Sequence, residues 1–234
     1  MRTLNFLLLL ILSSSVAQAG IVINGTRVIY PESEKEITLR LNNEGNKSSL
    51  VQTWIDKGNS SAKVNQIDVP FVILPPVFRV EPKQGQTLRI SYTGQNLPAD
   101  RESVFYLNVL DIPPNPENVH SNNVQMAFRS RIKLFFRPQA MKSESYSDAV
   151  DKLTWSAGSC STCIEVKNPT PFNITITKIY FTAESKEGSG IQGAMIAPFS
   201  SQNFKLGSNV GTNNITFSYL NDYGGTVKAQ LKKR

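Results

Sequence analysis

The stretch NNVQMAFRSRIKLFFRP, residues 122–138, alternates like a β-strand but carries an unusual density of positive charge. Its apolar residues Val124, Met126 and Phe128 alternate with polar or small neighbours. The same run holds the cations Arg129, Arg131, Lys133 and Arg137. From position 123 to position 137 the run has 15 residues and would span roughly 50 Å if fully extended, whereas ordinary strands have about 5–6 residues. The sequence therefore predicts a long, cationic strand whose partner is still to be identified.

Short strand-like segments fill the chain between residue 20 and this stretch. Each is rich in β-branched and aromatic residues and is bounded by Gly, Pro, Asn or Asp. In KEITLRLNN, for example, Ile37, Leu39 and Leu41 fall on one face. With the opening stretch they make seven segments, the others being GIVINGTRVIYP, KEITLRLNNE, LVQTWIDK, FVILPPVFRVEP, QTLRISYTG and SVFYLNVLDIPP. This spacing predicts an immunoglobulin-like sandwich for residues 20–139, without the disulfide of antibody domains.

A second β-rich region follows Pro138. The segment PQAMKSESYSD has no useful periodicity and predicts a short hinge. Residues 146–234 then contain the strand-like segments KLTWSAG, CIEVKNPT, FNITITKIYFTA, QGAMIAPFS, NVGTNNITFSYLND and TVKAQLKK. No convincing amphipathic helix is found anywhere. The sequence therefore predicts an all-β chain of two immunoglobulin-like β-sandwich domains.

The first 19 residues have the features of a secretory signal peptide. MRTLNFLLLLILSSSVAQAG contains one cation, Arg2, a short apolar run and the small-residue site Ala17-Gln18-Ala19. We expect cleavage between Ala19 and Gly20. The apolar run is shorter than the about 20 residues that a membrane span needs, and no later segment reaches that length. The sequence predicts an exported chain without membrane insertion.

Composition argues against several classes of function. Loss of Arg2 with the signal peptide lowers the formal charge from +7 to +6, but no basic motif of a nucleic-acid reader accompanies this charge. His120 is the single histidine, in the polar segment NPENVHSNN, and no GxSxG motif is present. No phosphate-binding loop, dinucleotide fingerprint or calcium loop occurs. We expect no catalytic residues, cofactor, metal or nucleic-acid partner.

The two cysteines, Cys160 and Cys163 in CSTC, have the spacing of a redox motif. Such a motif needs a helix that begins at the first cysteine, because the helix N-terminus lowers the pKa of that thiol. The following residues, CIEVKNPT, predict a strand instead. A small disulfide across a turn, in an oxidising compartment, is the interpretation we prefer.

Longer motifs resemble one known family. LPADRESVFYLNVLDIPP at 97–114, followed by RIKLFFRP at 131–138, is similar to the periplasmic chaperones of the chaperone–usher pilus pathway. TRVIYP at 26–31, LPPVFRVEP at 74–82, NPTP at 168–171 and NDYGG at 221–225 extend the resemblance over the whole of residues 20–234. It implies two immunoglobulin-like domains in a boomerang shape with a cleft between them. It also implies pilus or fimbrial subunits and an outer-membrane usher as partners.

The resemblance gives the opening strand a use. In this family the chaperone lends its seventh strand to a subunit that lacks its own last strand. Val124, Met126 and Phe128 are the residues at the positions that fill the subunit groove. The alternation alone equally allows these three side chains to face the core of their own domain.

The resemblance also assigns roles to charged residues. Arg27 in TRV and Lys133 in IKLFFRP match the pair that grips the C-terminal carboxylate of the subunit. Because Lys133 and Phe128 have opposite parity in a strand, we expect a bulge or strong twist between them. A buried ionic network that joins the two domains is implied for Glu102, Arg137 and Asp222.

Other sequence features indicate the branch of the chaperone family and bear on the alternative function. Eighteen residues, 115–132, lie between the IPP prolines and Lys133, which is close to the short-loop branch of the family. The CSTC pair is not part of the family pattern. The alternative is an immunoglobulin-like fimbrial subunit or adhesin, which should show an incomplete strand set and an N-terminal donor extension. Neither is seen, since strand-like sequence begins almost directly at Gly20.

Overall fold

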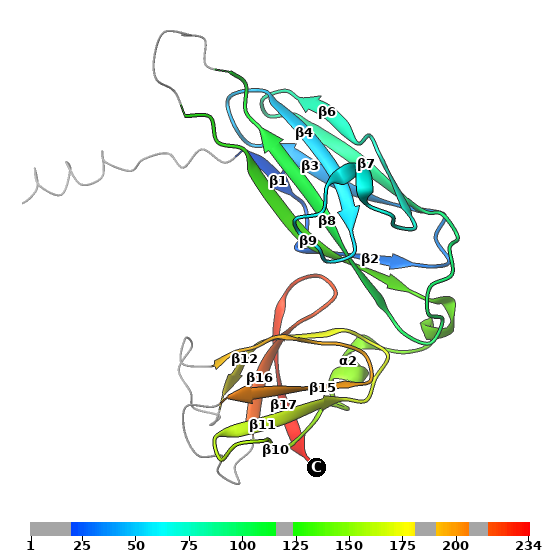
Figure 1. The fold of residues 1–234 in the computed structure, drawn as a ribbon, viewed down its shortest axis with the longest axis vertical. Coiled ribbons are helices and arrows are strands. Elements are labelled where there is room, and N and C mark those ends of the chain that lie inside the picture. The colour runs from blue at the N-terminus through cyan, green and yellow to red at the C-terminus, as the bar shows by residue number, and fades with distance from the viewer. Residues whose placement is uncertain (1–19, 116–123, 181–190, 206–214) are drawn as a thin grey trace, which may run out of the picture.

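A computed structural model describes residues 20–115, 124–180, 191–205 and 215–234. The expected signal peptide and His120 lie outside the described residues. Within the described ranges the chain forms two β domains that follow one another, each with its own apolar core (Figure 1). The all-β prediction is confirmed. The boomerang-like cleft between the domains stays a prediction.

The N-terminal domain is a sandwich of two sheets. The first sheet has the order β1-β3-β7-β5, with β1 at Ile21–Ile23, β3 at Glu36–Asn43, β7 at Gly85–Tyr92 and β5 at Phe71–Leu74. The second has the order β2-β9-β8-β4-β6, with β2 at Arg27–Pro31, β9 at Phe128–Arg137, β8 at Ser103–Ile112, β4 at Ser49–Asp56 and β6 at Val77–Val80. Side chains from both sheets, among them Leu41, Leu88, Leu107 and Leu134, are fully buried between them.

Two predicted segments each divide into two strands. GIVINGTRVIYP forms β1 in the first sheet and β2 in the second, and Gly25 between them has φ +139°. FVILPPVFRVEP changes sheet in the same way, from β5 to β6. The break lies at two prolines, which lack the N–H that a continuous ladder needs, and the Leu74–Pro75 peptide bond is cis. Counting its described residues, the domain therefore has nine strands rather than the seven segments predicted.

The C-terminal domain is built from one hydrogen-bonded path of strands. Its order is β13-β12-β16-β17-β10-β11-β15, and β14 pairs with β12. The bounds are β10 Thr154–Ala157, β11 Cys163–Asn168, β12 Ile174–Tyr180, β13 Ile191–Gln192, β14 Met195–Ile196, β15 Ser200–Lys205, β16 Ile215–Leu220 and β17 Thr226–Lys233. Parallel pairing of β10 with β17 joins the two halves. Both halves contribute buried side chains to a single core, including Trp155 and Phe217.

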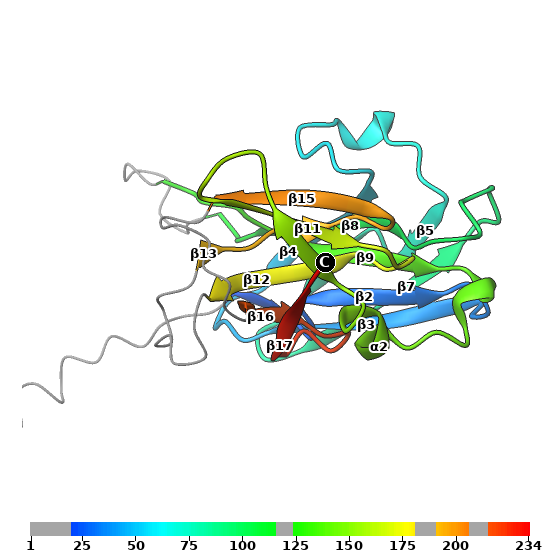
Figure 2. The same ribbon diagram turned by 90° about the horizontal axis from the view of Figure 1, so that it is seen from below.

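The hinge is more ordered than its sequence predicts. After a short 3-10 turn at Gln139–Met141 the chain forms the helix α2 at Tyr146–Val150, whereas the other 3-10 turn, at Val64–Gln66, lies between β4 and β5. The Oγ of Ser145 accepts a hydrogen bond from the Asp148 N–H and caps this helix. Met141, Tyr146 and Val150 are buried in the core of the C-terminal domain, and both views place α2 within that domain (Figures 1 and 2). The expectation of a hinge without a helix was wrong, because five residues are too few to show a helical period.

Candidate functional site

Arg27 and Lys133 lie beside each other in the second sheet of the N-terminal domain. Arg27 is the first residue of β2, and it is the register partner of Lys133 where β2 runs parallel to β9. Both side chains are partly buried. Arg27 Nη1 donates to the Leu220 carbonyl of the C-terminal domain at 3.4 Å. The two cations are therefore placed where the domains meet.

This pair of cations has unused capacity to bind an anion. Within the described ranges no carboxylate oxygen lies within 4.0 Å of either cation, and the buried Nε of Arg27 has no hydrogen-bond partner there. Burial lowers the pKa of Lys133, and the charge of Arg27 lowers it further. Two like charges held close together and partly shielded from water are costly in the free protein. An anion that binds both would relieve that cost.

Strand β9 presents a free edge that ends at these cations. On one side it pairs with β8 from the Asp111–Phe128 pair to the Ser103–Phe136 pair, which leaves out only its last residue. On the other side β2 covers it only from Lys133 to Arg137. Within the part of the chain that the structure describes, residues 128–132 have no strand on that side. The free edge and the cation pair therefore meet end to end.

The expected bulge between Phe128 and Lys133 is absent, whereas the strong twist expected as its alternative stays a prediction. The register of β8 with β9 is unbroken, and the two side chains lie on opposite faces of the sheet. Leu134 and Phe136 have the parity of Phe128 and are buried in the core of their domain. Phe128 therefore lies on the core-side face but beyond the end of the core.

The three alternating apolar residues face solvent. Val124, Met126 and Phe128 are 89%, 59% and 62% exposed. The alternative that they fill their own core was therefore wrong. Strand β9 has 10 residues instead of 15 and begins only at Phe128, so Val124 and Met126 precede it. An apolar row that nothing in the described structure covers leads into the free edge of β9.

Arg137 links the two domains through carboxylates on either side. Its Nη1 and Nη2 donate to the two oxygens of Asp222 at 2.7 and 2.6 Å, and its Nε donates to Glu102 at 2.7 Å. Glu102 and Arg137 belong to the N-terminal domain, and Asp222 lies in the turn between β16 and β17, drawn in red, which rises toward the N-terminal domain (Figure 1). The structure thus brings together all three residues of the expected network.

Glu102 is the most deeply buried member of this network. Its side chain is 1% exposed, and its second oxygen accepts hydrogen bonds from the Asn173 main-chain N–H at 2.9 Å and side chain at 3.3 Å. Burial raises the pKa of Glu102, while the charge and hydrogen bond of Arg137 oppose that rise. Burial also acts against the charge of Arg137, but Asp222 and Glu102 outweigh it and raise its pKa. The charge of Glu102 therefore depends on Arg137.

Gly224 gives a test of how closely the domains approach. It has φ +81° in the β16–β17 turn, and a Cβ at this position would overlap the Oγ1 of Thr26 in the N-terminal domain. We expect Gly224→Ala to destabilise the protein by about 2–4 kcal/mol, from the positive φ together with the overlap. Thermal unfolding measures the change.

Gly94 is a matched control for this prediction. It has φ +82°, and a Cβ there would meet nothing within 4 Å. Gly94→Ala should therefore cost only the about 1–2 kcal/mol of the backbone conformation. Adding Thr26→Ala should recover part of the Gly224→Ala loss. Equal losses for the two glycine variants would contradict a close contact between the domains.

The sequence did not predict the charged cluster of Arg131 and Asp56 beside Tyr106. Arg131 donates to both oxygens of Asp56, at 2.5 and 3.2 Å, and its guanidinium lies 3.7 Å from the centre of the Tyr106 ring. Burial alone would raise the pKa of Asp56, but hydrogen bonds from Arg131, Asn108 and Gly58 outweigh it and hold that pKa below its usual value. Asp56, Tyr106 and Arg131 come from the three strands β4, β8 and β9. They meet only because of the register between these strands, and the sequence alone does not predict that register.

Cys160 and Cys163 form a disulfide in the turn before β11. Strand β11 begins at Cys163, so the second cysteine enters a strand rather than a helix. This is the arrangement that the sequence predicted. The helix N-terminus that lowers a thiol pKa in a redox motif is missing here.

Among the described residues, no helix is long and apolar enough to cross a bilayer.

Comparison with known proteins agrees with this geometry. The family model described as "Pili and flagellar-assembly chaperone, PapD N-terminal domain" matches residues 20–142. That described as "Pili assembly chaperone PapD, C-terminal domain" matches residues 148–231. Between them the two models cover nearly all of the described chain.

Similar sequences and solved structures carry chaperone names. The probable fimbrial chaperone YadV of Escherichia coli (strain K12) is 41% identical over 231 residues, with 94% of this chain and 92% of the relative covered. Its crystal structure superposes with a TM-score of 0.74 at 40% identity and covers 91% of this chain and 100% of that one. A structure of the Salmonella enterica SafA pilin in complex with the SafB chaperone gives a TM-score of 0.75 at 27% identity, covering 93% and 99%. The chain therefore belongs to the family of pili assembly chaperones.

Proposed function

We propose that this protein is a periplasmic chaperone that binds pilus or fimbrial subunits and delivers them to an outer-membrane usher. The observation that carries the proposal is the free edge of β9, which ends at the adjacent cations Arg27 and Lys133. An exposed strand edge with unpaired main-chain groups is a template for strand addition. In this protein the free edge of β9 ends at a fixed pair of positive charges, Arg27 and Lys133.

The position of β2 sets the direction of the client strand. A client strand beside residues 128–132 would lie in line with β2, on the same side of β9. Its C-terminal carboxylate can reach Arg27 and Lys133 only if the strand runs in the direction of β9. The client strand is therefore parallel to β9, as β2 is. Two cations on one carboxylate would also prevent the register from slipping by a residue.

The exposed apolar row supplies the second half of the contact. In this proposal Val124, Met126 and Phe128 enter a groove in the client, because alternate residues of an added strand point to the same side. Full burial of each apolar side chain contributes about 1.5–3 kcal/mol, before the cost of association. This row would complete the fold of the client and prevent it from associating with other subunits.

Export belongs to the same proposal. Residues 1–19 would direct the chain to the periplasm, and cleavage would follow Ala19. The protein would act as a binding partner, not as an enzyme. The alternative of a fimbrial subunit is not favoured, because the N-terminal domain has its last strand, β9, in place between β2 and β8.

Substitution of Phe128 tests the proposal. We expect Phe128→Asp to weaken subunit capture at least tenfold, because a carboxylate would have to enter an apolar groove. Little packing is lost, since this side chain is 62% exposed, and thermal unfolding of the variant checks that a carboxylate opposite Asp111 leaves the domain folded. The measurement is a pull-down from periplasmic extract, with the captured chain identified by mass spectrometry.

Phe199→Asp is the matched control. Phe199 is an exposed aromatic residue of the C-terminal domain, 48% exposed, and far in sequence from the free edge of β9. Its substitution should leave capture unchanged. If Phe128→Asp retained subunits as well as the parent protein does, β9 would not be the donated strand.

A further inference from the structure

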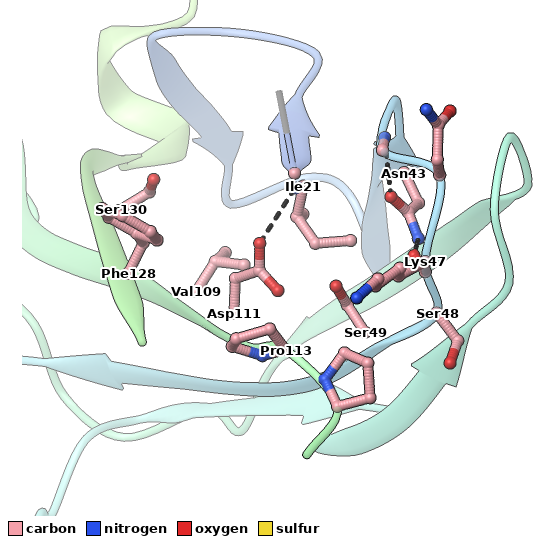
Figure 3. Close-up of a pocket in the computed structure, with 14 residues that line it drawn as sticks. Ile21, Asn43, Lys47, Ser48, Ser49, Val109, Asp111, Pro113, Phe128 and Ser130 are labelled. Atoms are coloured by element: carbon pink, nitrogen blue, oxygen red, sulfur yellow. Dashed lines mark hydrogen bonds between the residues drawn. The ribbon is translucent and has the colours of Figure 1, made fainter. Parts of the chain in front are cut away.

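A pocket at one end of the N-terminal sandwich contains an inward-facing carboxylate. On β8, Phe105, Leu107 and Val109 point into the core, and Asp111 is next on the same face. Asp111 lines a pocket of about 430 Å³ together with Val109, Phe128 and Ser130 (Figure 3). The carboxylate therefore stands at the mouth of an otherwise apolar core, directly opposite Phe128 in the β8–β9 register.

The hydrogen bonding of Asp111 is incomplete. Its Oδ2 accepts a hydrogen bond from the Ile21 N–H at 3.1 Å (Figure 3). Its Oδ1 is buried and, counting only residues that the structure describes, has no partner. A buried acceptor without a partner destabilises the folded state, more so when it is charged. This site is therefore short of one donor.

Gly20 lies beside the same carboxylate, on the side of its other oxygen, Oδ2. A Cβ on Gly20 would overlap Asp111 Oδ2, so the main chain passes directly beside the carboxylate. The Gly20 carbonyl accepts a hydrogen bond from the Glu44 N–H at 3.0 Å, which fixes the residue from its other side. The nitrogen and the Cβ position are bonded to the same Cα at about 1.5 Å. The nitrogen of Gly20 therefore lies within reach of Asp111.

We propose that the α-ammonium group of Gly20, created by proteolytic processing, binds Asp111 and locks the end of the sandwich that presents Phe128. The inference rests on the cleavage after Ala19 that is part of the proposed function. Hydrolysis of the Ala19–Gly20 peptide bond adds one water: the carboxylate leaves with the signal peptide, and the amine stays on Gly20 and takes up a proton. Before cleavage this nitrogen is a neutral amide, so the ion pair forms only in the processed chain.

The ion pair would tie the two sheets together. Gly20 leads into β1, a three-residue edge strand of the first sheet, whereas Asp111 is on β8 in the second sheet. Apart from the Ile21 N–H bond to Asp111, the hydrogen bonds of Gly20 and β1 within the described residues are with β3, with the turn after β3 and with Gly25 in the turn after β1. A charged tie at Gly20 would hold this short strand across the pocket from Phe128.

Two other charged residues, Lys47 and Glu44, lie near the pocket and must be distinguished from the Gly20 ammonium group. The turn after β3 contributes Lys47 to the pocket wall and Glu44 beside Gly20, whereas β9 contributes only the uncharged Phe128 and Ser130. No ion pair within 4.0 Å joins Lys47 to Asp111 in the described structure. Lys47 is the competing cation that the experiment must separate from Gly20.

The test compares two N-terminal forms of the chain. One begins at Gly20, and the other keeps Ala19 as one extra residue, which moves the amine away and leaves an amide at Gly20. Each is made with Asp111 and with Asp111→Asn. With Asp111 present, we expect the form that begins at Gly20 to melt about 3–10 °C higher than the extended form. With Asp111→Asn, the two forms should melt together, and Lys47→Ala should leave their difference unchanged.

Titration of the Gly20 α-amino group measures a pKa that a simple loss of packing would not change. In the form that begins at Gly20, NMR should show the α-amino pKa raised above its ordinary value of about 7.7–8.0. A raised pKa means that the stabilisation is complete below about pH 8 and disappears as the pH rises through the raised value. Equal melting of the two forms with Asp111, or an ordinary α-amino pKa, would overturn the inference.

Cleavage after Ala19 and the chaperone function are tested by different measurements. N-terminal sequencing of the exported protein should give Gly20 as the first residue, and any other first residue would overturn the inference. Subunit capture by the same preparation reports on the chaperone function by itself. Capture by a protein with a different N-terminus would therefore remove the Gly20–Asp111 lock and leave the proposed function intact.

Discussion

The variant Lys133→Met is expected to lose most of its subunit binding while it becomes more resistant to heat. Lys133 is partly buried beside Arg27, and both its burial and that neighbouring charge lower its pKa. A lysine whose folded-state pKa is lowered destabilises the fold at pH values below its unfolded-state pKa. Removal of the charge relieves this cost. It also removes one charge-assisted bond to the client carboxylate, worth about 1.5–3 kcal/mol, which corresponds to about 10–150-fold in affinity.

The measurement uses a synthetic peptide that copies the last strand of the captured subunit. Its affinity for the parent protein and for Lys133→Met is compared with that of the same peptide amidated at its C-terminus. Amidation should weaken binding to the parent far more than to Lys133→Met, because both changes remove the same interaction. Lys133→Arg, which keeps the charge, should retain most of the binding. Equal sensitivity of both proteins to amidation would exclude Lys133 from carboxylate binding.

The variant Arg137→Met should show the largest loss of stability. It would leave Glu102, whose side chain is 1% exposed, buried without its counter-charge. Removal of one partner from a buried ion pair costs about 3–5 kcal/mol, and for a chain of this size that lowers Tm by about 6–20 °C. The loss should be smaller for Asp222→Asn, since Asp222 is 28% exposed and Arg137 would keep Glu102.

Three comparisons make this prediction specific. Arg89→Met removes a surface pair with Glu36 whose members are 61% and 39% exposed, and because water screens such a pair its loss should leave Tm nearly unchanged. Adding Glu102→Gln to Arg137→Met should restore part of the stability, because no charge is then buried alone. With Arg137 absent, the folded-state pKa of Glu102 rises further, so the loss should shrink as the pH falls through that value. A pH-independent loss without rescue would point to packing rather than charge.

The sequence predicted the two β domains because their strands bury one face and alternate clearly, as in β3 and β11. It did not predict where strands change sheet. The segments that begin at Gly20 and Phe71 were each predicted as one strand, because alternation reports burial on a face and not which sheet supplies the partner. The helix α2 was missed for a related reason: its buried residues Tyr146, Ala149 and Val150 have helical spacing, but they cover little more than one turn.

The candidate site was predictable in part. The motifs around Arg27, Lys133, Glu102, Arg137 and Asp222 were recognisable as a family pattern, and the structure brings the residues of each set together. The resemblance implied that Val124, Met126 and Phe128 are exposed to a partner, but the alternation did not, because it looks the same whether the apolar face meets its own core or another molecule. The role of Asp111 was not predicted, since one carboxylate in a strand becomes unusual only when the structure shows it on the core-facing side of β8 with a buried oxygen that lacks a partner.

The point where β2 begins has a consequence for quality control in the cell. Because β2 occupies the track beside β9 from Lys133 onward, a client strand has no room to continue past its final carboxylate. A subunit with residues appended to its end would collide with β2, and one cut short would leave both cations without an anion. The chaperone would therefore select subunits by the position of their C-terminus and bind only chains that end at the correct residue.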